Sequence, residues 1–156
     1  MKLVPTLEGG LRLDAESPVD VRFLQAIVHD AASHDLARNL GGLMTDETLA
    51  QDWEDFVIPD LQDGFDHQID HVSRALEAAL AAPGDATATL WIKPADAPAW
   101  YGALNQARLA LEEIHGLSRL ERSDLAGANP ALLSAVFRCR FYQEFQERLL
   151  EHVMER

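Results

Sequence analysis

The stretch Trp100-Tyr-Gly-Ala-Leu-Asn-Gln-Ala-Arg-Leu-Ala-Leu111 decides much of the fold, because its apolar residues recur at helical spacing. One stripe of the predicted helix consists of Trp100, Leu104, Ala107, Leu111 and Ile114. Arg108 falls inside this stripe. Since a guanidinium is always charged, its position among core residues requires a partner.

Two neighbours on the same helix suggest how Arg108 is used. Asn105 lies one turn before it and Glu112 one turn after it. Arg108 could face a cleft and recognise an anion or carboxylate. We favour an internal polar clamp of Asn105, Arg108 and Glu112, because buried charges are usually paired. The acid that closes this clamp would be Glu112, or Glu54 or Asp55 from elsewhere in the chain.

Other segments of the chain also predict helices. Ser17-Pro18 and Asn129-Pro130 are each an N-cap followed by proline at the first helical position. The helical register after Ser17 slips near Ser33. A clean apolar stripe predicts a helix over 58–80, and Pro59 should end or kink the helix that precedes it. The last helix is apolar on two sides, which is typical of a central bundle helix or of a subunit contact in a homo-oligomer.

Two segments favour strands. Residues 2–13 form a predicted hairpin around Glu8-Gly9-Gly10, and residues 87–93 form one further β-rich strand. Because a lone strand is unstable, we expect that strand to join the hairpin. The predicted fold is therefore mainly α: a helical bundle of about five helices with a small sheet, in a single domain over residues 1–156.

Composition excludes several classes of function. The net charge of −13 repels phosphate backbones and anionic lipid, so we expect neither direct nucleic-acid binding nor membrane association. The N-terminus lacks the apolar run of a signal peptide, and no segment reaches the apolar length of a membrane helix. These features predict a cytoplasmic protein. No phosphate loop, nucleophile elbow or dinucleotide fingerprint is present, so we favour a role without catalysis and expect no cofactor.

The helix over 58–80 carries a polar cluster opposite its apolar stripe. His67 and His71 are one turn apart, and Asp63 lies one turn before His67. Two imidazoles at this spacing can chelate a divalent metal, with Asp63 as a third ligand. Alternatively, carboxylates such as Asp63 and Asp70 favour charged histidines, which would make the patch respond to mild acidification. A plain solvated acidic face is the interpretation that we favour.

The sole cysteine, Cys139, excludes an intramolecular disulfide and a Cys-based zinc cluster within one chain. Its neighbours Arg138 and Arg140 could lower the pKa of the thiol and make it reactive. However, Cys139 falls on the apolar edge of the last helix with Leu132 and Ala135. We therefore expect a buried structural thiol.

The segment from Ala103 to Leu111, preceded by Trp100, resembles an uncharacterised bacterial family, domain of unknown function number two-thousand-seventeen. Trp53 to Phe65 and the closing segment Tyr142 to Leu150 are similar to the flanking parts of that family. The family is best known from actinobacteria, where its genes often neighbour a ClpS-type protease adaptor. Some members are linked to oxidative-stress transcription through protein partners.

The resemblance implies a regulatory or protein-interaction domain with a stress-related role, and it assigns no catalytic residue. Because only Cys139 is present, an intramolecular thiol switch does not carry over to this chain. The alternative function is a metal-binding helical protein that uses His67, His71 and Asp63.

Overall fold

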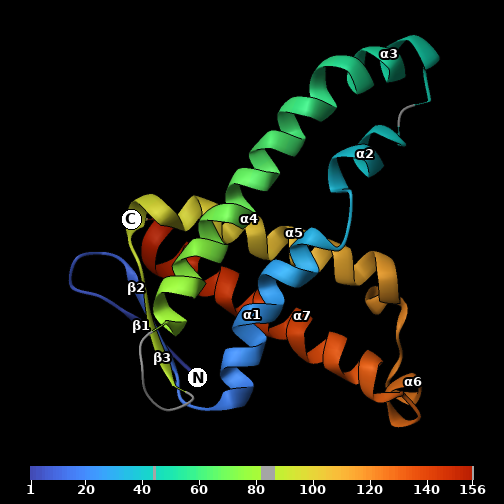
Figure 1. The fold of residues 1–156 in the computed structure, drawn as a ribbon. Coiled ribbons are helices and arrows are strands. Elements are labelled where there is room, and N and C mark those ends of the chain that lie inside the picture. Colours follow the sequence, from blue (N-terminus) through green and yellow to red (C-terminus); the bar gives the residue numbers. More distant parts are fainter. Residues whose placement is uncertain (44, 82–86, 156) are drawn as a thin grey trace.

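A small antiparallel sheet packs against a layer of long helices (Figure 1). The computed structural model describes residues 1–43, 45–81 and 87–155. The strand order is β1-β2-β3, with β1 over Lys2–Pro5, β2 over Leu11–Ala15 and β3 over Ala88–Ile92. The N-terminal hairpin and the strand predicted over 87–93 therefore form one sheet, as expected.

Four long helices and three short ones complete the fold within the described residues. The long helices are α1 (Pro18–Ala32), α4 (Ile58–Leu80), α5 (Ala97–His115) and α7 (Pro130–Leu149). The short helices are α2 (Leu36–Gly41), α3 (Glu47–Asp52) and α6 (Arg122–Ala126). Short 3₁₀ turns are η2 (Pro94–Asp96) and η3 (Leu117–Arg119), and π-helical turns are η1 (Trp53–Val57) and η4 (Leu150–Met154). The mainly α prediction is confirmed.

The helix boundaries follow the capping residues. Ser17 Oγ accepts a hydrogen bond from the Asp20 N–H at 3.2 Å, and Asn129 Oδ1 accepts one from the Leu132 N–H at 2.8 Å. Each cap satisfies a backbone donor that has no partner inside its helix. At the C-terminal end of α5, Gly116 takes the left-handed conformation with φ 59°, which glycine adopts without steric cost.

Helix α5 lies at the centre of the core, where it contacts α1, α4 and α7. Trp100 is almost completely buried, and its ring centroid lies 5.7 Å from that of Phe145 on α7. The predicted stripe is buried as far as Leu111, whereas Ile114 is exposed. Periodicity placed Ile114 on the correct face, but the packed part of the stripe ends one turn earlier. In the described residues, no helix is long and apolar enough to cross a membrane.

The segments α3, η1 and α4 form one continuous rod over residues 47–80, because the backbone stays helical at both junctions. The prediction that Pro59 ends or kinks the preceding helix is wrong in its first alternative, since the helix does not end there; the kink stays a prediction. Proline has no N–H and its ring crowds the carbonyl of the residue four positions earlier. The chain widens to a π-helical turn just before it, with the Ile58 N–H bonded to the Trp53 carbonyl, and then continues as α4.

Candidate functional site

One face of the sheet is open, and the alternation of the strands decides which side chains it carries. Leu11 and Leu13 of β2 and Leu90 of β3 point inward and are buried. Neighbouring side chains on a strand point to the opposite face, which leaves the outer face to residues such as Arg12 and Trp91. The register aligns Val4, Arg12 and Trp91 in one row across the three strands.

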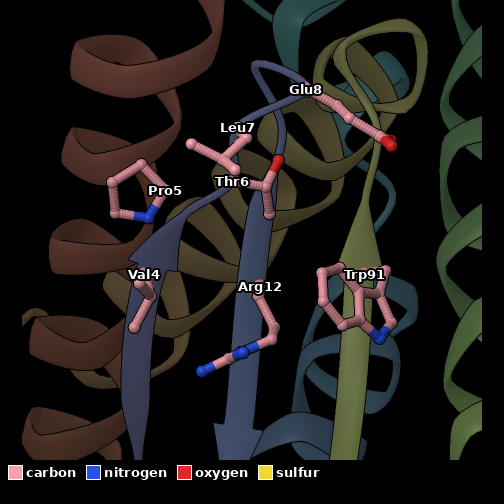
Figure 2. Close-up of a pocket in the computed structure, with 7 residues that line it drawn as sticks. All are labelled: Val4, Pro5, Thr6, Leu7, Glu8, Arg12 and Trp91. Atoms are coloured by element: carbon pink, nitrogen blue, oxygen red, sulfur yellow. The ribbon is translucent and has the colours of Figure 1, made fainter.

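This row forms part of a groove of about 530 Å³ on the outer face. Figure 2 shows the lining residues, with the helices lying behind the sheet. The groove is lined by Val4, Pro5, Thr6, Leu7, Glu8, Arg12 and Trp91. Trp91 is 60% exposed, and Leu7 at the hairpin tip is fully exposed. Large apolar side chains that stay in water next to a groove are typical of a binding surface.

Arg12 gives the groove its polar component. Its guanidinium carbon lies 5.6 Å from the centroid of the Trp91 ring, within range of a cation–π interaction. The same guanidinium bonds the Asp14 carboxylate, at 3.1 Å through Nε and 3.0 Å through Nη2. These two contacts with Asp14 restrain Arg12, so the groove has a positioned guanidinium beside an exposed aromatic ring.

The hairpin tip that closes one end of the groove is held by its two glycines. Gly9 has φ +83°, a conformation that favours glycine. A Cβ on Gly10 would lie 2.4 Å from the Ile92 carbonyl oxygen, so only glycine fits there. The Gly10 N–H also donates to Thr6 Oγ1 at 2.9 Å. These contacts fix the conformation of the hairpin tip that carries Leu7.

A family model described as Domain of unknown function (DUF2017) matches residues 6–153. The chain belongs to this family. No curated protein and no solved structure matches it. The matched residues include β2, β3 and the long helices of this DUF2017 domain.

Arg108 is held by an amide from a different helix. Its Nη1 donates to Gln146 Oε1 on α7 at 2.7 Å, and Gln146 Nε2 donates to the Tyr101 carbonyl at 3.2 Å. Glu112 bonds Ser118, through the Ser118 N–H at 2.9 Å and its hydroxyl, so it serves the turn after α5. Asn105 is exposed. The proposed grouping of Asn105, Arg108 and Glu112 is thus not brought together as one bonded set.

The polar cluster on α4 is spread along the helix. His67 is exposed, and its Nδ1 donates to the Asp63 carbonyl oxygen at 2.8 Å. His71 points to another element, with Nε2 3.4 Å from Asp96 Oδ1. Asp70 is exposed, and its carbonyl accepts from Arg74 Nε. Across the described ranges, no group of three or more His, Cys, Asp or Glu side chains could hold a metal ion. Metal binding at this cluster stays a prediction.

Cys139 is partly buried and packs against the core. On the same helix the structure reveals a network that the sequence analysis missed. Asp30 of α1, which is 5% exposed, accepts hydrogen bonds from Arg138 Nε and from the Tyr142 hydroxyl, both at 2.7 Å. Burial and the Asp30 carboxylate both raise the pKa of Tyr142, which keeps its hydroxyl protonated as a donor.

The sequence contained a signal for two of the three missed features. Asp30 lies three residues after Ile27 on the apolar side of α1, but the register slip near Ser33 obscured it. Trp91 lies between Leu90 and Ile92, and strand alternation turns it outward if those two are buried. The partner of Arg108 had no local signal, since Gln146 is 38 positions away.

Proposed function

We propose that this DUF2017 chain is a protein-interaction domain without catalytic activity, and that the groove beside Trp91 binds an apolar side chain of a partner protein. The observation that carries the proposal is the 60% exposure of Trp91 beside a preformed groove. Tryptophan is enriched among the residues that dominate binding energy at protein interfaces. An indole that is 60% exposed beside a groove is difficult to explain by folding alone.

The strand edges favour side-chain insertion over strand addition. Both β1 and β3 are edge strands. At the groove end of β1, Pro5 lacks the N–H that an added strand would need. Beside β3 lies α4, in contact with it. An extended partner segment that crosses the outer face would therefore bind through a side chain packed between Leu7 and Trp91.

We further propose that this binding is regulatory, serves a stress response and takes place in the cytoplasm. The support for regulation and stress is the family resemblance, and the support for the compartment is the composition of the chain. The regulatory partner would be a protein, because the net charge of −13 disfavours a nucleic acid or an anionic membrane.

The test is affinity capture from native lysate with the wild-type chain and with Trp91→Ala. A matched control is Phe137→Ala, which removes an exposed aromatic ring on α7 that does not line this groove. The captured protein is then titrated against all three chains by calorimetry. We expect Trp91→Ala to weaken binding at least about tenfold and Phe137→Ala to leave it unchanged. Equal affinity for wild type and Trp91→Ala would reject the groove as the binding site.

A further inference from the structure

A helical arm projects from the body of the molecule at the end of the rod farthest from the sheet (Figure 1). We define the acidic arm as residues 36–43 and 45–64, which comprise α2, α3, η1 and the first two turns of α4. Helix α2 lies beside the part of the rod that belongs to the arm, in contact with η1 and α4. The Cβ of any larger residue at Gly41 would lie 3.0 Å from Trp53 Cδ1 and 3.1 Å from Ile58 Cδ1. The arm is thus closely packed at the point where its two helical segments meet.

The base of the arm is fixed to the body by polar contacts. Asn39 Nδ2 donates to both carboxylate oxygens of Glu113 on α5, at 2.9 and 2.8 Å. His34 Nε2 contacts the same carboxylate. These bonds cross from the start of the arm to the central helix. These contacts therefore hold the arm in a defined position relative to the body.

Several large apolar side chains of the arm nevertheless remain in water. Leu43 is 78% exposed, Phe56 72% and Leu49 58%, and Leu40 is exposed as well. Single exposed leucines are ordinary on protein surfaces, but an aromatic ring and three leucines on one small element are not. Their burial against a partner would remove a substantial apolar area from water.

The charged residues of the arm and of the adjoining part of α4 are almost all acidic. From Asp46 to Asp70 the sequence has nine acidic residues and no Lys or Arg. All nine acidic side chains are exposed, and seven of them lie in the arm, from Asp46 to Asp63. The segment from Asp46 to Asp70 therefore has a formal net charge of −9, compared with −13 for the whole chain. The summed field attracts cations and repels any acidic surface.

We propose that the acidic arm binds a basic amphipathic helix of a partner protein. The apolar face of such a helix would pack on Leu49 and Phe56, and its Lys and Arg residues would face the carboxylates around them. A second copy of this chain is a poorer occupant, because pairing two arms brings together two sets of carboxylates with Arg38 as the one Lys or Arg in the sequence of each arm. The inference is independent of the groove beside Trp91 and adds a second binding surface to the domain.

The probe is a fluorescent synthetic helix of Leu and Lys in amphipathic order, titrated by fluorescence anisotropy against the full chain. A peptide of the same composition in scrambled order tests whether the apolar face is needed. We expect the ordered peptide to bind, its affinity to fall steeply with added salt, and the scrambled peptide to bind at least about tenfold more weakly.

The protein variants locate the surface. The double substitution Leu49→Ser/Phe56→Ser should weaken binding at least about tenfold, whereas Ile114→Ser/Phe137→Ser, which removes exposed apolar residues of α5 and α7, should have no effect. Since all four side chains are exposed, melting temperatures should stay within about 2 °C of wild type. Amide chemical shifts that change on titration should fall in residues 36–64. The Trp91→Ala variant should bind the peptide normally, which separates this proposal from the proposed function.

Four outcomes would overturn the proposal. They are no binding of the ordered peptide, equal binding of the scrambled peptide, equal binding by Leu49→Ser/Phe56→Ser, and a dimer in sedimentation analysis that this double variant dissociates. The last outcome would assign the arm to a second copy of the chain.

Discussion

The body of the molecule and its acidic arm differ in how their polar and apolar groups are placed. In the body, the buried residues Asp30 and Gln106 have polar partners: Asp30 is bonded by Arg138 and Tyr142, and Gln106 donates to Gln68 at 2.8 Å. In the arm, Phe56 and its apolar neighbours remain in water, beside carboxylates with no Lys or Arg between them in sequence. Stability should therefore depend mainly on the body, whereas the exposed apolar side chains of the arm are available for binding in addition to the groove beside Trp91.

Breaking the Asp30 network should produce the largest effect. Asp30→Ala leaves the Arg138 charge and the Tyr142 hydroxyl without their shared acceptor. We expect a loss of about 3 kcal/mol in the free energy of unfolding, since removal of one partner strands a largely buried charge. Urea denaturation measures this loss directly. The control Asp52→Ala removes an exposed carboxylate of the arm and should change stability by less than about 0.5 kcal/mol. Equal effects of the two substitutions would break the contrast between body and arm.

Two helical glycines sharpen the contrast, because substitution by alanine should destabilise the protein at the glycine in the body and stabilise it at the glycine in the arm. A Cβ at Gly102 in α5 would lie 2.2 Å from Gln68 Oε1, which accepts the Gln106 hydrogen bond. A Cβ at Gly64 in α4 would meet nothing within 4 Å. Gly102→Ala should therefore destabilise by about 1 kcal/mol, and Gly64→Ala should stabilise by about 0.5 to 1 kcal/mol through helix propensity.

Thermal melts of the two glycine variants, recorded side by side, test this pair. A gain in stability for Gly102→Ala would mean that the Gln68 side chain moves aside at little cost and that its hydrogen bond from Gln106 contributes little to stability.

Arg108 should contribute less to stability than Asp30, although both lie in the body. Arg108→Met keeps most of the apolar stem, loses the bond to Gln146 and removes an Nε that has no partner in the described part of the chain. We expect a change below about 1 kcal/mol, because the lost bond and the removed unsatisfied donor largely offset each other. Chemical denaturation provides the value. Misfolding of Arg108→Met would instead support the tight internal clamp, and a stable fold with altered ligand binding would support a site.

The smallest effect concerns pH. Burial raises the pKa of Asp20, but the Met1 α-ammonium at 2.9 Å and the Glu16 N–H at 2.8 Å more than offset it, so the pKa lies below its ordinary value of 3.8. A lowered pKa gives stability that is present above that ordinary value and is lost as pH falls through the folded value. Asp20→Asn should therefore lose less stability than wild type below about pH 4. Parallel curves of melting temperature against pH would contradict the assignment.

Local signals predicted the elements of this fold well. The caps at Ser17 and Asn129 and the stripe over 58–80 depend on neighbours in sequence, so the bounds of α1, α4 and α7 follow from them. The same is true of the sheet, whose hairpin and third strand each carry their own pattern.

The candidate sites were harder to predict because they depend on which elements meet. Spacing on one helix paired Arg108 with Glu112, yet packing of α5 against α7 brings Gln146 closer. His67 and His71 are one turn apart on α4, but His71 contacts Asp96 of a different element, whereas His67 bonds the Asp63 carbonyl. The groove beside Trp91 is formed by three strands in register, and no single segment encodes it.

The π-helical turn over Trp53–Val57 sets the rotational phase of the arm. A π turn accommodates one more residue than an α turn, and each residue of an α-helix advances the azimuth by about 100°. Deleting one residue from this turn would restore α geometry and rotate the tip of the arm by about that angle relative to the body. The direction in which Leu49 faces therefore depends on the number of residues in the turn before Pro59, so a single-residue insertion or deletion there would rotate α3 relative to the body without altering a side chain of α3.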